Sequence, residues 1–162
     1  MASSLRMISH SSEETRQVGA CLGSCATEGD VFLLSGNLGA GKTCLTQGIA
    51  TGLGVQAYTR SPSFVIATRY QGRLTLHHID LYRLEDPLEV WDLALDEIVG
   101  REGVSVVEWA EHAADQFSVE YMWIALDYGT NPCDRSIEFT SAGSRYEGHL
   151  AAVRERFALG KP

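Results

Sequence analysis

The chain has 162 residues, 44% apolar and 21% charged, which is close to an average globular domain, so we expect one domain over 1–162 with a frayed tail at about 159–162. This composition excludes long disorder, collagen and coiled coils. No apolar run approaches the roughly 20 residues of a membrane span, and the first residues lack a signal-peptide core, which predicts a cytoplasmic protein without membrane contact. The net charge is −8 and no long basic stripe is present, so unaided binding to nucleic acid is not expected.

The first half of the chain predicts two helices around one buried strand. A capping box that begins at Ser11 predicts a helix over 12–28, which Gly29 ends. The short apolar run 31–35 predicts a buried strand. A glycine-rich turn follows it, and the next helix is expected over 42–53.

The second half alternates strands with short helical segments. On the helix predicted to begin at Pro87, Trp91 is expected in the core. Strands that alternate with helices predict a mostly parallel sheet with helices on both faces, and two hairpin-like pairs predict antiparallel edges. This is a three-layer α/β fold. The predicted elements are strands over 64–70 and 74–80, a helix over 87–94, a helical turn over 96–99, strands over 104–107, 121–128 and 135–140, and a helix over 144–158.

Charge is unevenly distributed along the chain. Residues 85–120 contain 11 acids and one Arg, a net charge of −10. The simpler interpretation is a set of solvated helix faces, and the alternative is a docking surface for a basic partner.

The segment Gly36–Thr43, with sequence GNLGAGKT, matches the phosphate-binding pattern G-x-x-x-x-G-K-[ST] without a gap. Glycines allow successive backbone N–H groups to point at an anion, and the helix that follows adds its positive N-terminal end. In such a loop Lys42 reaches the β- and γ-phosphates, and the Thr43 hydroxyl is a ligand for Mg²⁺. Since the pattern lies between a predicted strand and a predicted helix, we expect a P-loop nucleotide site.

A magnesium ion in such a site also needs a carboxylate at the end of a neighbouring strand. Glu108 ends the apolar run 104–107, and Asp80 ends the strand over 74–80. Glu108 is the better metal candidate, because its strand is the more buried of the two. The other acid is then free to orient the attacking water. The adjacent His77 and His78 face opposite sides of a strand, so packed or solvated side chains are expected there.

Three kinds of nucleotide-binding protein fit a P-loop at this chain length: a nucleoside triphosphatase, a small-molecule kinase and a nucleotide-gated binding module. The guanine-reading pattern N-K-x-D and the switch pattern D-x-x-G are both absent from the sequence, which favours ATP over GTP. A small-molecule kinase shares the loop, although no arginine-bearing lid stands out. A nucleotide-gated binding module that does not need hydrolysis also fits.

Four separate segments together resemble one family. GNLGAGKT at 36–43, SPSF at 61–64, HHIDLYRL at 77–84 and EW at 108–109 follow the order and spacing of the TsaE (YjeE) family. The resemblance implies a P-loop ATPase of bacterial tRNA threonylcarbamoyladenosine biosynthesis, whose ATPase activity is weak in the absence of its partners. It also implies docking on a TsaB–TsaD heterodimer, which hydrolysis resets between turnovers, and contact with tRNA only through that complex.

The resemblance also implies roles for individual residues. The family's phosphate cradle corresponds to 38–43, and its Mg²⁺-linked acids correspond to Asp80 and Glu108. We therefore expect Lys42, Asp80 and Glu108 to be catalytic, and Thr43 and Glu108 to hold Mg²⁺. The family's switch-like segment corresponds to 61–64. The nucleotide-binding positions are Thr15, Leu38, Gly39, Ala40, Gly41, Lys42, Thr43, Cys44 and Trp109.

Overall fold

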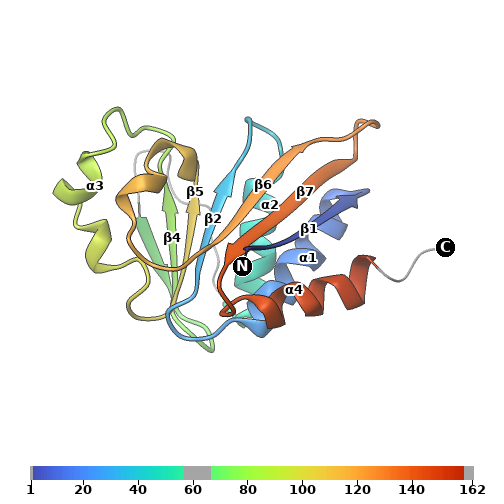
Figure 1. Ribbon diagram of the computed structural model, residues 1–162, viewed down its shortest axis with the longest axis horizontal. Helices are drawn as coiled ribbons and strands as arrows, with labels where there is room; N and C mark the ends of the chain where they lie inside the picture. Colours follow the sequence, from blue (N-terminus) through green and yellow to red (C-terminus); the bar gives the residue numbers. More distant parts are fainter. Residues whose placement is uncertain (1, 57–66, 159–162) are drawn as a thin grey trace.

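The computed structural model describes residues 2–56 and 67–158. Its centre is a seven-stranded sheet in the order β1-β7-β6-β2-β5-β4-β3 (Figure 1). The strands are β1 (Ala2–Ser9), β2 (Val31–Ser35), β3 (Ala67–Tyr70), β4 (Leu76–Asp80), β5 (Val104–Glu108), β6 (Met122–Tyr128) and β7 (Arg135–Ala142). The helices are α1 (Ser12–Cys25), α2 (Lys42–Gly52), α3 (Glu89–Asp92) and α4 (Glu147–Val153), with the 3₁₀ turns η1 (Leu95–Glu97), η2 (Ala110–His112) and η3 (Ala114–Gln116) and the π-helical turn η4 (Arg154–Ala158).

The sheet is parallel in its centre and antiparallel at its edges. Strands β6, β2, β5 and β4 run parallel, whereas β3 pairs antiparallel with β4, and β7 with both β6 and β1. This pattern confirms the predicted fold class. Within the part of the chain that is described, no helix is both long and apolar enough to cross a membrane.

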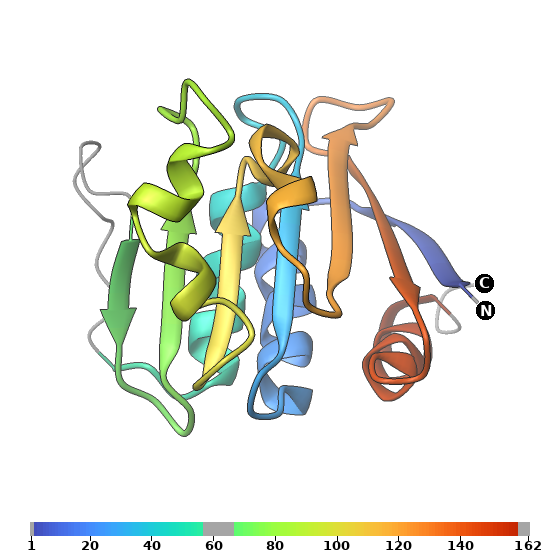
Figure 2. The ribbon, with the colours of Figure 1, turned by 60° about the vertical axis from the view of Figure 1, so that its left-hand side comes forward.

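Alternating side chains of the central strands feed two separate cores. On one face α1, α2 and α4 pack against residues such as Phe32 and Val106, and on the other α3 and the 3₁₀ turns cover Leu33 and Val107 (Figure 2). Every residue of β5 is buried, as expected of a strand covered on both faces. The predicted three layers are therefore present, although the second helical layer consists of single turns.

Two predictions in the acidic segment and one at the N-terminus differ from the structure. Helix α3 is one turn, because Ala94 adopts a left-handed conformation (φ 55°) that redirects the chain. Val90 fills the core, and the prediction of a buried Trp91 is wrong, since its side chain is 54% exposed. Strand β1 was not predicted, because few apolar residues mark its alternation of exposed and more buried positions.

Helices α1 and α2 touch backbone to backbone through facing glycines. A Cβ atom on Gly48 would lie 2.1 Å from the carbonyl oxygen of Arg16, and one on Gly19 would lie 2.3 Å from that of Leu45. No side chain fits at either position without moving a helix. The glycines therefore fix the separation of the two helices.

Asp30, at the start of β2, joins three parts of the chain. Its buried carboxylate accepts a hydrogen bond from the Thr27 N–H at 2.9 Å and from Arg145 Nε at 3.0 Å, and lies 2.8 Å from His149 Nε2. Burial alone would raise the pKa of Asp30, but these bonds and the nearby positive charges outweigh it and lower that pKa. The Thr27 bond also turns the chain after Cys25, so α1 ends three residues before the predicted position.

Replacing Asp30 by Asn should lower the free energy of unfolding by about 3 kcal/mol at neutral pH, because it removes the buried carboxylate charge that pairs with Arg145. The loss should shrink as the pH falls below about 4. The unfolded carboxyl takes up its proton near the ordinary pKa of about 3.9, above the lowered folded value, so the wild type loses the same stabilisation in that window. Urea unfolding of both proteins at several pH values measures this difference; a constant difference down to pH 3 would contradict it.

Candidate functional site

The glycine-rich loop 36–41 connects β2 to α2, as the sequence predicted. Gly41 precedes the helix with φ 109°, and Gly36 has φ 144°, both conformations that other residues rarely adopt. A Cβ atom on Gly36 would also lie 2.3 Å from the carbonyl oxygen of Leu126 on β6. The loop is therefore shaped by its glycines and held against the neighbouring strand.

Lys42 is the first residue of α2, and its ammonium group points back over the loop. Nζ donates to the carbonyl oxygens of Gly36 and, at 3.0 Å, Asn37, and it lies 3.9 Å from the ring centroid of Trp109. Burial lowers the pKa of Lys42, while the charges of Glu111, Glu108 and Asp80 act against that shift. The site thus holds one cation among three carboxylates.

The two predicted acids are register partners on adjacent parallel strands, Asp80 on β4 and Glu108 on β5. Thr43 Oγ1 donates to Glu108 Oε1 at 3.1 Å, and the other carboxylate oxygen of Glu108 contacts His78 Nε2. His78 is buried, as expected, and it orients the carboxylate. The structure brings Lys42, Thr43 and both acids together.

Asp80 differs from Glu108 in its surroundings. Its Oδ1 accepts the backbone N–H of Tyr82 at 2.9 Å. Burial raises the pKa of Asp80, and the charge of Glu108 adds to that increase. A carboxylate with a raised pKa is suited to accept a proton, and Glu108, bonded to the hydroxyl of Thr43, has the surroundings that a P-loop metal site requires of its carboxylate.

The donor set can be tested against a magnesium nucleotide. Among residues 2–56 and 67–158, no group of three or more His, Cys, Asp or Glu side chains is arranged to hold a metal ion by itself. A P-loop magnesium site does not need one, because it uses a hydroxyl, one or two carboxylates and phosphate oxygens. Thr43, Glu108 and Asp80 fit that requirement.

A cavity of about 210 Å³ adjoins the loop on the side away from the acids. Thr15, on α1, lies in its wall, where its hydroxyl is 2.7 Å from that of Ser9 and donates to the carbonyl oxygen of Ser11. Cys44 lines it from α2. The predicted positions therefore divide into a charged end at Lys42 and this cavity, which is lined by Ser12, Thr15, Gly39, Gly41, Cys44, Pro132, Cys133 and Arg135.

Three residues that the sequence analysis did not single out hold the loop from outside. Arg135 donates from Nε and Nη2 to the carbonyl oxygen of Gly39, at 3.3 and 3.2 Å. The hydroxyl of Tyr128 donates to the carbonyl oxygen of Leu38. Glu111 accepts the backbone N–H of Gly36 at 3.1 Å. These contacts join residues 75 to 96 positions apart, so no local pattern reveals them. Leu38 itself is 74% exposed at the loop tip.

Arg135→Ala should weaken binding of an ATP analogue about tenfold, because the loop carbonyls lose the donor that fixes them; that factor corresponds to about 1.4 kcal/mol. A fluorescent ATP analogue measures the dissociation constant directly. Arg6→Ala is the matched control, since Arg6 is exposed and pairs with Glu138 on the neighbouring strand β7. Equal affinities for both variants would show that Arg135 does not organise the loop.

The switch-like segment 61–64 lies outside the described residues. The roles of all predicted site residues stay predictions.

The chain is similar to known proteins over most of its length. Residues 9–137 match the family model for the threonylcarbamoyl adenosine biosynthesis protein TsaE. The TsaE protein of Bacillus subtilis is 43% identical over 136 residues, covering 83% of this chain and 84% of that protein. The Treponema pallidum protein of the same name is 40% identical, covering 75% and 90%.

A solved structure gives the same result. The crystal structure of YdiB from Bacillus subtilis superimposes with a TM-score of 0.80 and 36% sequence identity, over 96% of this chain and 97% of that one. With the family match spanning most of the sequence, the chain belongs to the TsaE family.

Proposed function

We propose that this chain binds and hydrolyses Mg-ATP as the ATPase subunit of tRNA threonylcarbamoyladenosine biosynthesis in the cytoplasm. Its partner in this proposal is a TsaB–TsaD heterodimer, which ATP hydrolysis resets between turnovers. The chain contacts tRNA only through that complex. The pathway rests on family membership. The observation that carries the ATPase proposal is the hydrogen bond from Thr43 Oγ1 to Glu108 Oε1, beside a loop that Lys42 closes.

Each group of the site has a task in this proposal. The loop amides and Lys42 bind the phosphates, and Thr43 and Glu108 hold Mg²⁺, which neutralises charge on the phosphate oxygens when bound. Asp80 orients the attacking water and accepts its proton, a role that suits its raised pKa. The cavity beside Thr15 and Cys44 takes the nucleoside.

The test is the rate of phosphate release from Mg-ATP, with and without a purified TsaB–TsaD pair. Slow release alone and a clear increase with the pair would support both parts of the proposal. An unchanged rate with the pair would refute the partner assignment. ADP formed without free phosphate when metabolites are added would instead indicate a kinase, and full pathway function with a non-hydrolysable analogue would indicate a nucleotide-gated binding module.

A further inference from the structure

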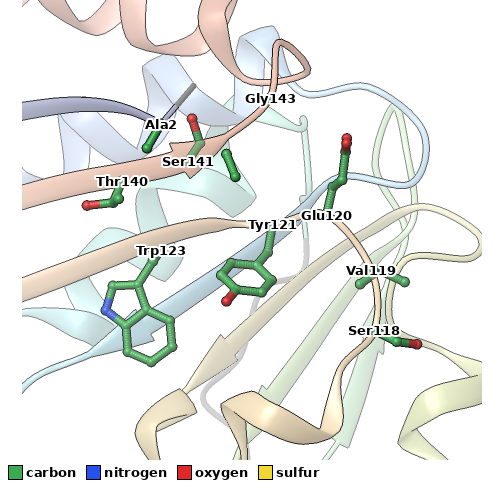
Figure 3. A pocket seen from close by; sticks show the side chains of 10 residues that line it. Ala2, Ser118, Val119, Glu120, Tyr121, Trp123, Thr140, Ser141 and Gly143 are labelled. Carbon is green, nitrogen blue, oxygen red and sulfur yellow. The ribbon is translucent and has the colours of Figure 1, made fainter.

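Two hollows away from the loop meet along one short segment of chain. The larger, of about 670 Å³, and the smaller, of about 180 Å³, are both lined by Ser118 and Val119, which lead into β6. Figure 3 shows this segment continuing into the side chains of Tyr121 and Trp123. The two hollows therefore adjoin along this segment, and we call them together the 118–119 groove.

The larger hollow exists because the two faces of the sheet are covered unequally. Helices α1 and α4 pack on one face of β1, β7 and β6, whereas the core under α3 and the 3₁₀ turns extends only to Tyr121 and Trp123. These two rings are half-buried, with centroids 6.3 Å apart, and Thr140 on β7 is exposed beside them. This end of the groove is an aromatic surface suited to a large apolar side chain.

The smaller hollow pairs an aromatic ring with a carboxylate. Trp91 donates from Nε1 to Gln116 Oε1 at 2.9 Å, and this bond holds its indole in the lining of the hollow although the residue is 54% exposed. Asp96 lines the same hollow, and the buried Phe117 contributes to its lining. An indole and a carboxylate in the lining of one hollow are suited to bind a lysine or arginine side chain.

The charge around the groove favours the same ligand. Residues 85–120 carry a net charge of −10 with His taken as neutral, and Arg101, their one arginine, lines the smaller hollow. Within the described ranges 2–56 and 67–158, neither Arg101 nor Asp96 forms an ion pair. Leu88 and Leu93, on either side of Trp91 in the chain, are 59% and 40% exposed. Exposed apolar side chains within an acidic surface are typical of a protein-binding site.

We propose that the 118–119 groove docks an extended segment of a protein partner, with a lysine or arginine side chain between Trp91 and Asp96 and a large apolar side chain against Tyr121 and Trp123. The partner's identity rests on the proposed function, in which the bound protein is the TsaB–TsaD pair. The groove is separate from Lys42 and Glu108, so docking and hydrolysis can be tested apart.

The experiment measures binding of the TsaB–TsaD pair to the full chain by calorimetry, at low and high salt. Trp91→Ala and Thr140→Arg, at exposed positions that leave the cores intact, should each weaken binding about tenfold or more. Asp96→Asn should weaken it several-fold and reduce its salt dependence, and Arg101→Gln should strengthen it by removing the like charge. Glu13→Gln, an exposed acid on α1, is the matched control.

The outcomes separate the groove from the proposed function. Groove variants that bind the pair as tightly as the wild type would overturn the proposal that the 118–119 groove is the docking site. They would leave the ATPase proposal in place. Self-association that Thr140→Arg abolishes, without binding to the pair, would overturn the proposal in favour of a second copy as occupant. All groove variants should keep the basal rate of phosphate release, and Lys42→Ala should still bind the pair; a wild type that neither releases phosphate nor binds the pair would refute the proposed function as well.

Discussion

Lys42→Ala should reduce phosphate release from Mg-ATP by roughly 10²–10³-fold, the usual cost of removing one electrostatic contact to a transition state. The ammonium group lies over the loop, where three carboxylates favour its charged form despite burial. No other residue named at the site supplies a positive charge at that point. The measurement is single-turnover release with nucleotide in excess over its dissociation constant.

Lys161→Ala is a natural control, because Lys161 is the chain's one other lysine. It should leave the rate unchanged. Thermal unfolding of the Lys42 variant should stay within a few degrees of the wild type, since the side chain bonds only to loop carbonyls and packs on Trp109. If Lys42→Ala turned over ATP at the normal rate, the P-loop assignment would be wrong.

Glu108→Gln should lower turnover about 10²-fold or more and shift the Mg²⁺ concentration for half-maximal rate upward. The amide keeps the size of the side chain and its bond from Thr43 but removes the charge that a metal requires. Alanine is the poorer choice, because it would also remove the partner of the buried His78 nitrogen. A magnesium titration of the hydrolysis rate measures both effects.

Asp80→Asn separates the two acids. It should lower the maximal rate while leaving the magnesium dependence close to that of the wild type, because Asp80 bonds to the Tyr82 N–H rather than to Thr43. The reverse pattern, a magnesium shift in Asp80→Asn and none in Glu108→Gln, would exchange the roles of the two residues.

The parts of the site that lie close together in sequence were predictable. A strand, a glycine-rich turn and a helix follow within residues 31–52, so the position of Lys42 and Thr43 follows from spacing alone. Glu108 was predictable because it ends a run buried on both faces of the sheet. Asp80 followed from the hairpin pattern, and parallel pairing then placed the two acids side by side.

Features that depend on distant contacts were not predictable. Arg135 and Tyr128 reach the loop from β7 and β6, and neither stands in a pattern that marks it. The left-handed Ala94, which follows the single turn of α3, gives no signal in the sequence. Nor does the sequence show that Val90 rather than Trp91 is buried on that turn. Strand β1 is added at the edge of the sheet by pairing with β7, whose residues are 126 to 140 positions away.

The glycine contact between α1 and α2 has a consequence for nucleotide exchange. Because Gly19 and Gly48 bring the two backbones into contact, we expect the two helices to move as one body, together with Thr15 and Cys44. The cavity beside the loop is thus rigid on the helical side. Apart from Gly39 and Gly41 of the loop, its remaining wall consists of Pro132, Cys133 and Arg135, from the connection between β6 and β7 and the first residue of β7. We therefore expect motion of that connection, rather than sliding of the helices, to control how fast a nucleoside enters and leaves.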